Sequence, residues 1–199
     1  MKLFLCIDLE ATCFDRDILG REQTHRDMET IEIGVVALNN QGTIIDTFQS
    51  YVKPTYTELS PYCTSVIGIT ADMLVGAPNF PDVIARLAEW LATLPAQPDC
   101  WYSWGKYDLK QLTLDAGPER WKLALPLPEH RNAKRLFQRR NLKKSREVGL
   151  LKALELTGLE FEGRHHSAID DAKNVARLFH QFHQHETPIH PALYVRKDS

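Results

Sequence analysis

The segment Ile7-Asp8-Leu9-Glu10-Ala11-Thr12 decides the fold, because it joins an apolar strand to a pair of acids. The preceding run, from Lys2 to Ile7, is almost wholly apolar and rich in strand formers, which predicts a strand covered on both faces. Residues two apart on a strand point to the same side, so Asp8 and Glu10 share one small volume. Two carboxylates that close stay ionised only beside positive charge, and a hard cation such as Mg2+ or Mn2+ meets that need. The alternative is that both acids face water at the end of the strand.

The composition is that of an ordinary globular domain. Of the 199 residues, 43% are hydrophobic and 25% are charged, which suits one domain with a substantial core. We expect a single domain over residues 1–185 and a C-terminal extension over residues 186–199. No apolar run approaches the length of a membrane span and the N-terminus lacks a signal-peptide pattern, so no membrane association is expected. The four cysteines are scattered, which predicts reduced thiols and a cytoplasmic location.

Positive charge is concentrated between Arg131 and Arg146. This segment holds 8 of the 24 Lys and Arg residues in 16 positions and contains no acid, so the remaining 16 basic and 26 acidic residues give the rest of the chain a charge of −10. A basic segment on an otherwise acidic protein suits contact with a nucleic-acid phosphate backbone. A solvated helix or loop face is the alternative.

Hydrophobic periodicity predicts both strands and helices. Apolar runs predict strands over residues 31–38, 43–52 and 100–104, and the turn at residues 39–42 makes the first two an antiparallel hairpin. Residues 16–29 are polar and predict a loop. Amphipathic spacing and capping residues predict helices over residues 70–74, 79–94, 107–116, 145–156 and 167–185, and a short strand or helix over residues 133–138.

Two further acids and a histidine stand at the edges of predicted elements. A helical crossover makes the strand over residues 100–104 parallel to the first strand, so Asp108, just after it, is expected beside Asp8. His166 precedes the last helix and Asp171 lies in its first turns, a spacing from which both can reach one site. A one-residue step on a helix turns a side chain by about 100°, so Asp170 is expected to be a cap or supporting group. The neighbouring His165 is the less favoured base.

These five positions, in this order, resemble the DEDDh (DnaQ-like) 3′–5′ exonucleases. In that superfamily the motifs are Asp-x-Glu on the first strand (here 8–10), Asp after the fourth strand (108) and His-x4-Asp at the last helix (166–171). Further stretches are similar to the ERI-type exoribonucleases: Asp-Leu-Glu-Ala-Thr-Cys (8–13), Leu-Ser-Pro-Tyr-Cys (59–63), Gly-Ile-Thr (68–70), Asn-Ala-Lys (132–134) and His-x3-Asp-Asp-Ala-Lys-Asn (166–174).

The resemblance implies a ribonuclease-H-like α/β fold, with a mixed five-stranded sheet, the first three strands antiparallel, and helices on both faces. It also implies phosphodiester hydrolysis with two Mg2+ or Mn2+ ions, one activating a water and the other stabilising the leaving 3′ oxygen. The ions would be held by four carboxylates, those of Asp8, Glu10, Asp108 and Asp171. His166 would be the general base, since imidazole titrates near neutral pH.

The same resemblance implies contacts with the terminal nucleotide, in addition to those of Glu10 and His166. Tyr62 and Tyr107 fall where aromatic rings stack on the terminal base, an interaction that contributes about 1–3 kcal/mol per base. Ordinary half-buried packing is the alternative for both rings. Ala11 and Thr12 are expected to approach the sugar with their backbone. Lys134 is a candidate phosphate contact.

The expected function is a 3′–5′ exonuclease on single-stranded ends that releases nucleoside 5′-monophosphates, with RNA favoured over DNA. Two alternatives remain open at this point. One is a DNA-directed exonuclease of the same superfamily, and the other is a non-catalytic RNA-binding module. The sequence does not predict the oligomeric state.

Overall fold

A five-stranded mixed sheet forms the centre of the computed structural model, which describes residues 1–142 and 146–183. The strand order is β3-β2-β1-β4-β5, with β2 antiparallel to β1 and β3, and β4 parallel to β1 and β5. The strands are β1 (Leu3–Ala11), β2 (Thr30–Asn39), β3 (Ile44–Tyr51), β4 (Pro98–Ser103) and β5 (Glu129–Asn132). The predicted mixed five-stranded sheet is therefore confirmed.

Strand β1 is buried on both faces, as its apolar sequence predicts. Phe4 and Cys6 belong to one core, whereas Leu3, Leu5 and Ile7 belong to the core on the opposite face. The alternation follows from the two-residue period of a strand. Asp8 and Glu10 have the parity of Phe4 and Cys6, so they stand on the face of the sheet that the C-terminal helices cover.

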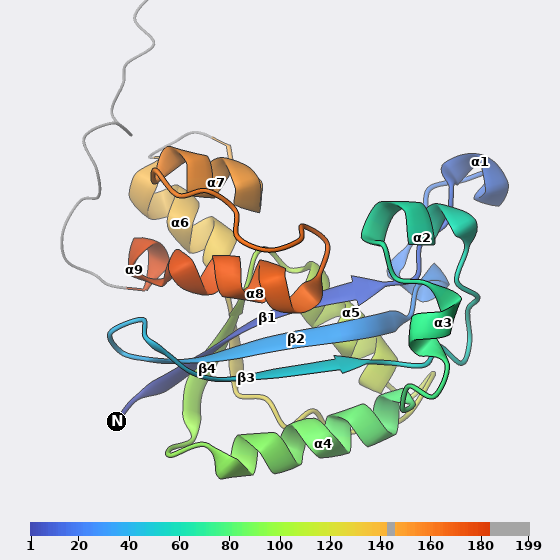
Figure 1. The fold of residues 1–199 in the computed structure, drawn as a ribbon, viewed down its shortest axis with the longest axis horizontal. Helices are drawn as coiled ribbons and strands as arrows, with labels where there is room; N and C mark the ends of the chain where they lie inside the picture. Colours follow the sequence, from blue (N-terminus) through green and yellow to red (C-terminus); the bar gives the residue numbers. More distant parts are fainter. Residues whose placement is uncertain (143–145, 184–199) are drawn as a thin grey trace, which may run out of the picture.

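Helices cover both faces of the sheet (Figure 1). One face packs against α6 (Ala133–Asn141), α7 (Leu150–Leu156), α8 (Ala168–Arg177) and α9 (Phe179–Phe182). The other face packs against α4 (Phe80–Thr93) and α5 (Tyr107–Ala116). The short elements α1 (Arg16–Leu19), the 3-10 helix η1 (His25–Asp27), α2 (Pro61–Ile67) and α3 (Ala71–Leu74) lie in the connections. No helix in the described ranges has the length and apolar character needed to cross a membrane.

Three element predictions differ from the structure. The polar stretch over residues 16–29 is not a simple loop, because Asp15 caps α1 and Asp27 accepts hydrogen bonds that close η1. Helix α7 begins only after Gly149, whose extended backbone stops the helix from reaching back toward residue 146. The last helix ends at Arg177, and a separate turn, α9, follows after Leu178.

Three predictions fall wholly or partly outside the described residues. Ser145, at the predicted start of the helix over residues 145–156, lies outside them. So do the last two residues of the predicted helix over residues 167–185, and the whole of the extension expected over residues 186–199.

Helix α8 approaches the sheet as closely as two backbones allow. A Cβ atom at Gly34, on β2, would stand 2.3 Å from the carbonyl carbon of Ala168 and the amide nitrogen of Ile169. Real side chains do not tolerate such a distance, so this position needs glycine for space. The absent side chain lets the first turn of α8 rest on the strand beside β1.

Candidate functional site

Carboxylates from three distant segments meet in one pocket of about 400 Å3. It lies at the carboxyl ends of the parallel strands β1 and β4, where α/β sheets commonly bind ligands. The structure brings all five predicted catalytic residues to its wall: Asp8 and Glu10 from β1, Asp108 from the first turn of α5, His166 from the loop before α8, and Asp171 from α8. Their roles stay predictions until the chemistry is measured.

The acids are close enough to share a cation. One oxygen from each of Asp8, Glu10 and Asp171 lies within 4.8 Å of the others. Asp108 lies outside this triplet but in the same pocket, and its Oδ1 accepts a hydrogen bond of 3.2 Å from the backbone N–H of Leu9. Strand β1, which carries Asp8 and Glu10, therefore also fixes the position of Asp108.

Burial and mutual repulsion disfavour the charged forms of these acids. Burial, and then the charges of neighbouring carboxylates, raise the pKa of Asp8 well above its usual range and that of Glu10 to about 8. Burial raises the pKa of Asp108 to about 6, against the effect of its hydrogen bonds. The pKa of Asp171 is raised, again mainly by burial. A cation bound among these acids would relieve the repulsion between their charged forms.

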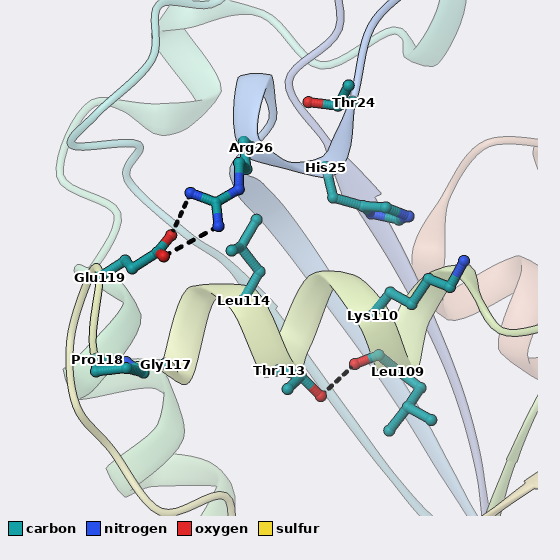
Figure 2. Close-up of a pocket in the computed structure, with 10 residues that line it drawn as sticks. All are labelled: Thr24, His25, Arg26, Leu109, Lys110, Thr113, Leu114, Gly117, Pro118 and Glu119. Carbon is teal, nitrogen blue, oxygen red and sulfur yellow. Dashed lines mark hydrogen bonds and ion pairs between the residues drawn. The ribbon is translucent and has the colours of Figure 1, made fainter.

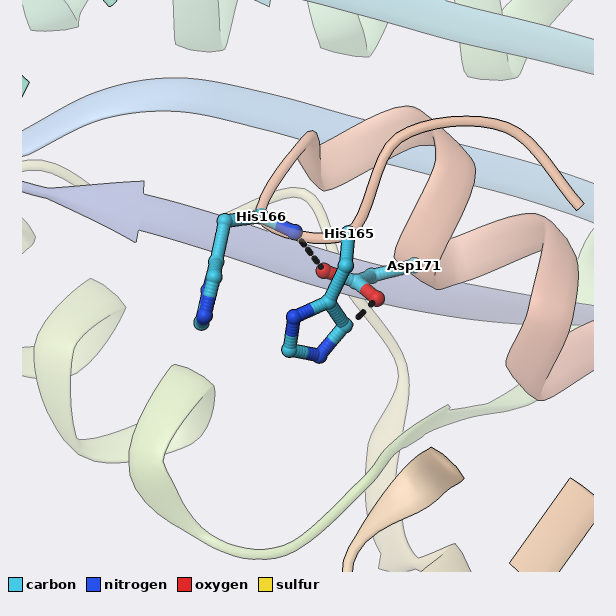
Figure 3. A group of neighbouring side chains, drawn as sticks. All are labelled: His165, His166 and Asp171. Atoms are coloured by element: carbon cyan, nitrogen blue, oxygen red, sulfur yellow. Dashed lines mark hydrogen bonds and ion pairs between the residues drawn. The ribbon is translucent and has the colours of Figure 1, made fainter. Parts of the chain in front are cut away.

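The two oxygens of Asp171 have different surroundings. Its Oδ2 accepts a hydrogen bond of 3.0 Å from the backbone N–H of His166, whereas its buried Oδ1 accepts no hydrogen bond and has His165 Nε2 at 4.0 Å (Figure 3). A buried carboxylate oxygen without a donor is costly unless another positive group binds it. No Lys or Arg lines the pocket within the described ranges. The carboxylate oxygens of Asp8, Glu10 and Asp171, one of which accepts no hydrogen bond, fit Mg2+ or Mn2+.

His166 stands at the rim of the pocket in a strained conformation. Its φ of 64° lies in the left-handed region, which is uncommon outside glycine and is found at functional sites. Its Nδ1 is 3.7 Å from Glu10 Oε1, and its side chain is 44% exposed. Burial, and then the charge of His165, lower the pKa of His166, so the neutral ring that can accept a proton prevails at neutral pH.

The neighbouring His165 also lines the pocket, although its place in the sequence made it the less favoured base. Its ring centroid is 4.0 Å from that of His166, and its Nε2 is 4.0 Å from Asp171 Oδ1. Both rings project from the loop that leads into α8 (Figure 3). Asp170, by contrast, accepts a hydrogen bond of 3.0 Å from the backbone N–H of Arg164 and does not line the pocket. Its predicted supporting role agrees with that contact.

The predicted substrate contacts divide into two groups. Ala11 and Tyr107 line the pocket, and Tyr107 is 39% exposed, with its ring 4.9 Å from that of His25. Tyr62 is 42% exposed on α2 but is not part of the lining. It lies one helical turn before Val66, which does line the pocket, so its ring stands at the margin.

Thr12 and Lys134 lie away from the pocket wall. Thr12 is fully buried, its N–H donates to the carbonyl of Glu29, and its hydroxyl accepts from the Glu29 N–H at 2.9 Å. Its N–H and hydroxyl are therefore committed to the fold. Lys134 lies in the first turn of α6, half-buried.

Glu32 is a residue of the site region that sequence reasoning missed. It is fully buried on β2, directly across the sheet from Glu10. It accepts hydrogen bonds from the side chain of Gln49 at 2.6 Å and from the N–H of Ala168, the first residue of α8, at 3.1 Å. A lone acid inside an apolar strand was the available signal. Glu32 therefore fixes the start of the helix that carries Asp171.

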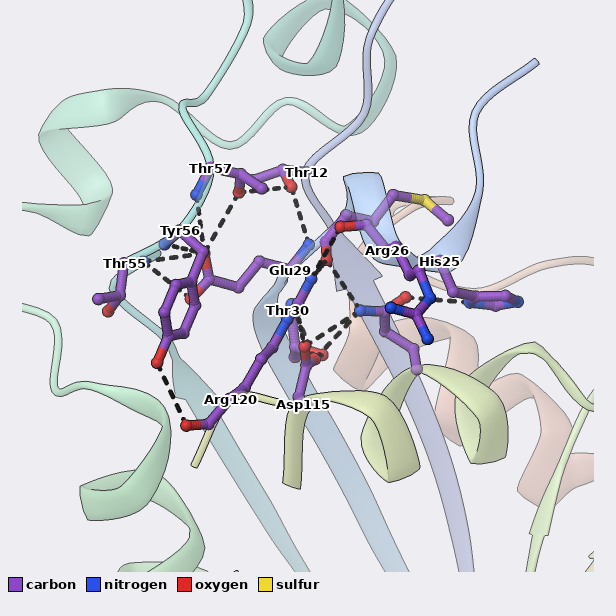
Figure 4. Close-up of polar contacts among 12 residues, drawn as sticks. Thr12, His25, Arg26, Glu29, Thr30, Thr55, Tyr56, Thr57, Asp115 and Arg120 are labelled. Carbon is purple, nitrogen blue, oxygen red and sulfur yellow. Dashed lines mark hydrogen bonds and ion pairs between the residues drawn. The ribbon is translucent and has the colours of Figure 1, made fainter. Parts of the chain in front are cut away.

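A second group of buried acids lies beside the site but is fully occupied by donors (Figure 4). Glu29 accepts hydrogen bonds from the backbone N–H groups of residues 55–57 at 2.8–3.1 Å. Asp115 accepts from the N–H and hydroxyl of Thr30, from Gln111, and from Arg120, with which it forms an ion pair. These contacts hold the segment after β3 and the start of β2 next to the carboxyl end of β1.

A larger cavity, of about 750 Å3, lies between η1 and α5 (Figure 2). Its single lining carboxylate, Glu119, is paired with Arg26 at 2.6 Å, so it lacks the acid cluster of the smaller pocket. His25 lines this cavity and packs against Tyr107 of the acid pocket.

Comparisons with known proteins agree with this geometry. The family model described as Exonuclease (RNase_T) matches residues 5–179. Human 3'-5' exoribonuclease 1 is 33% identical over 182 residues, which cover 88% of this chain and 51% of that protein. Human ERI1 exoribonuclease 3 is 33% identical over 189 residues, which cover 88% of this chain and 52% of that protein. The chain thus spans about half the length of the curated relatives it matches.

A solved structure gives the same agreement in three dimensions. The nuclease domain of 3'hExo, a DEDDh family member solved bound to rAMP, superposes with a TM-score of 0.75 at 31% identity. The match covers 89% of each chain.

Proposed function

Because the chain belongs to the Exonuclease family, we propose that it is a divalent-metal-dependent 3′–5′ exonuclease that hydrolyses phosphodiester bonds at single-stranded 3′ ends. RNA is the favoured substrate over DNA, because the similar human proteins are named exoribonucleases. The products are nucleoside 5′-monophosphates. The observation that carries the proposal is the convergence of four carboxylates from three segments in one pocket, with oxygens of Asp8, Glu10 and Asp171 within 4.8 Å of one another.

Two Mg2+ or Mn2+ ions would be held by Asp8, Glu10, Asp108 and Asp171. Such a centre supplies Lewis acidity, which favours a hydroxide nucleophile at neutral pH and stabilises charge on the leaving oxygen. The carboxylates are positioned in advance: the N–H of Leu9 holds Asp108, and the N–H of His166 holds Asp171. Preorganised ligands reduce the cost of assembling the centre when substrate binds.

His166 acts as the general base. Because its Nδ1 faces Glu10, Nε2 is the atom that would take the proton from the attacking water. Its exposure at the rim lets the ring reach substrate and exchange the proton with solvent. His165 lies close enough to replace it in part, so single substitutions are needed to separate the two rings.

The terminal nucleotide binds between the acids and the aromatic rim. Tyr107 is placed to stack on the base and Tyr62 to contact it from the margin, while Ala11 approaches the sugar. Stacking of this kind tolerates every base, which suits an exonuclease that must accept successive ends. The four cysteines are free thiols, which supports a reducing, cytoplasmic location.

The direct test incubates end-labelled single-stranded RNA with the protein in Mg2+, in Mn2+ and in EDTA, with DNA of the same sequence in parallel. We expect mononucleotides to be released from the 3′ end with either metal and none with EDTA, and RNA to be shortened faster than DNA. Faster shortening of DNA would identify the DNA-directed alternative. RNA binding without hydrolysis in any metal would identify the non-catalytic module.

A further inference from the structure

A second concave site, remote from the acids, lies between β5, α6 and α9. It has a volume of about 390 Å3 and shares no lining residue with the catalytic pocket. Three of its lining residues are arginines, and we call it the arginine pocket: Arg131, Arg135 and Arg139, around Tyr102 and Phe182.

The local structure explains why the three arginines gather there. Arg135 and Arg139 are one helical turn apart on α6, so they project from the same face. Arg131 lies at the end of β5, four positions before Arg135, and pairs across the sheet with Tyr102. The apolar face of the same helix, with Ala133 and Phe137, is buried in the core. Packing of the apolar face of α6 therefore keeps Arg135 and Arg139 on its opposite, exposed face.

The three arginines have no carboxylate partner in the described part of the chain. No ion pair joins Arg131, Arg135 or Arg139 to a carboxylate in residues 1–142 or 146–183, and all three are exposed. The floor is polar as well, since the hydroxyl of Tyr102 forms a hydrogen bond of 2.8 Å with His183 Nδ1. The guanidinium group presents a planar fork of donors that matches the oxygens of a phosphate. An anion with phosphate geometry is the ligand that this chemistry selects.

The position of the pocket indicates a polymer rather than a single phosphate. Helices α8 and α9 lead from the catalytic pocket to the arginine pocket, and the 15 steps from Ala168 to His183 correspond to about 22 Å at 1.5 Å per residue. A strand whose 3′ end sits among the acids would reach this distance only several nucleotides upstream. A row of arginines along a helix suits successive phosphates of such a strand better than one isolated anion.

We propose that the arginine pocket binds the phosphodiester backbone of the nucleic-acid strand upstream of its 3′ end. The carboxylate cluster repels phosphate in the absence of metal, so affinity for the strand must come from elsewhere on the protein. This inference rests on the proposed function for the direction of the strand. It gives the basic segment a specific contact surface, formed by Arg131, Arg135 and Arg139 and not by the half-buried Lys134.

The test measures binding in EDTA, where no hydrolysis is expected. Arg135→Gln and Arg139→Gln, singly and together, are compared with Arg86→Gln, which removes an exposed charge from α4 on the opposite face of the sheet. Fluorescence anisotropy reports affinity for an RNA of about 20 nucleotides and for a trinucleotide. For the long RNA we expect the double variant to bind about tenfold more weakly, with a salt slope lower by about 0.7 for each phosphate that the protein no longer neutralises. Arg86→Gln should bind like the parent, and the trinucleotide should bind every variant equally.

Three results would overturn the inference. The first is an unchanged affinity of the double variant for the long RNA. The second is an equal loss in Arg86→Gln, which would show a general charge effect. The third is an equal loss of affinity for the trinucleotide in the double variant, which would place the arginines at the 3′-terminal nucleotide and not upstream of it. Thermal melting of each variant at the parent temperature confirms that the fold is intact.

The outcome is separable from that of the proposed function. If the parent binds long RNA through the arginines but hydrolyses no RNA with any metal, the arginine pocket stands and the exonuclease assignment fails. If the parent hydrolyses RNA and the double variant has the parent KM for the long substrate, the exonuclease assignment stands and the arginine pocket fails.

Discussion

Two groups of buried acids lie side by side in this molecule and differ in the number of hydrogen-bond donors around them. Glu29 and Asp115 accept hydrogen bonds from backbone amides, hydroxyls and an arginine (Figure 4). Glu10 and Asp171, on β1 and α8, are surrounded mainly by other carboxylates. Hydrogen-bond donors satisfy the oxygens of the first group, whereas in the second group burial and neighbouring carboxylates raise the pKa of Glu10 and Asp171. Burial of an acid is therefore informative only together with the number of donors around it.

The largest effect that this comparison predicts is a loss of activity when an acid of the catalytic pocket is replaced. Asp8→Ala should abolish metal-dependent RNA trimming, with a fall in kcat/KM of at least about 1,000-fold, because a ligand to the metal ions is removed. RNA binding in EDTA should survive. Asp170→Asn, on the neighbouring position of the same helix as Asp171, is the matched control and should keep most of the activity. Trimming at the parent rate by Asp8→Ala would show that the assigned site is wrong.

The next largest effect concerns the contact that places α8. Gly34→Ala puts a Cβ within 2.3 Å of the α8 backbone, so the helix must move. We expect the free energy of unfolding to fall by about 2–4 kcal/mol and activity to fall with it. Urea denaturation measures the first effect, and the RNA assay under folding conditions measures the second. Gly76→Ala, where nothing lies within 4 Å but φ is positive, is the control for backbone strain alone. A Gly34→Ala protein no less stable than Gly76→Ala would contradict the close approach.

Substitutions that remove the charge of an acid should change stability in opposite directions in the two groups. Glu29→Gln loses acceptor strength toward three backbone amides and should destabilise by about 1–3 kcal/mol. Glu10→Gln relieves repulsion and should stabilise the protein in EDTA while impairing metal binding. Thermal melts with and without Mg2+ measure both. If the two substitutions change stability in the same direction in EDTA, the distinction between the groups fails.

The last predicted effect is in the pH dependence of stability. The pKa of Glu10 is raised to about 8 in the folded protein from an ordinary value of 4.5, so the folded state binds more protons between these values. Stability in EDTA should therefore fall as the pH rises through this window, because stability falls wherever the folded state holds the extra proton. Glu10→Gln should flatten that dependence, and Mg2+ should oppose it because binding releases protons. Melting temperatures measured from about pH 5 to about pH 8 test this sign.

The sequence predicts four of the five strands, and the acids near their ends, because both depend on local pattern. Apolar runs give β1 to β4, and acids just after strand ends are brought together by a parallel sheet. Strand β5 (Glu129–Asn132) has no apolar residue, and the segment after it, predicted as a strand or helix, is helix α6. The fifth strand and the place of His166 and Asp171 in the same site follow from the resemblance to the DEDDh exonucleases. The family match confirms the superfamily to which that order of motifs points. For Asp8 and Glu10, the two-residue period of a strand is enough to place both side chains on the same face of the sheet.

Other features depend on contacts between distant segments and could not be predicted. Glu32 is an acid within an apolar strand, and its role depends on the backbone N–H of Ala168 on α8, which donates a hydrogen bond to it from 136 positions later. Thr12 is itself a predicted sugar contact, yet its N–H and hydroxyl form hydrogen bonds with the backbone of Glu29. The end of α8 at Arg177 leaves no mark in the hydrophobic spacing, which continues through Phe179 and Phe182. Periodicity reports which face is buried, not where a helix stops.

The close contact at Gly34 has a consequence for the substitutions that the protein tolerates. At this crossing, main-chain atoms set the closest separation between β2 and the helix that carries Asp171. A substitution at position 34 would therefore alter the spacing of the ligand oxygens while leaving every ligand residue unchanged.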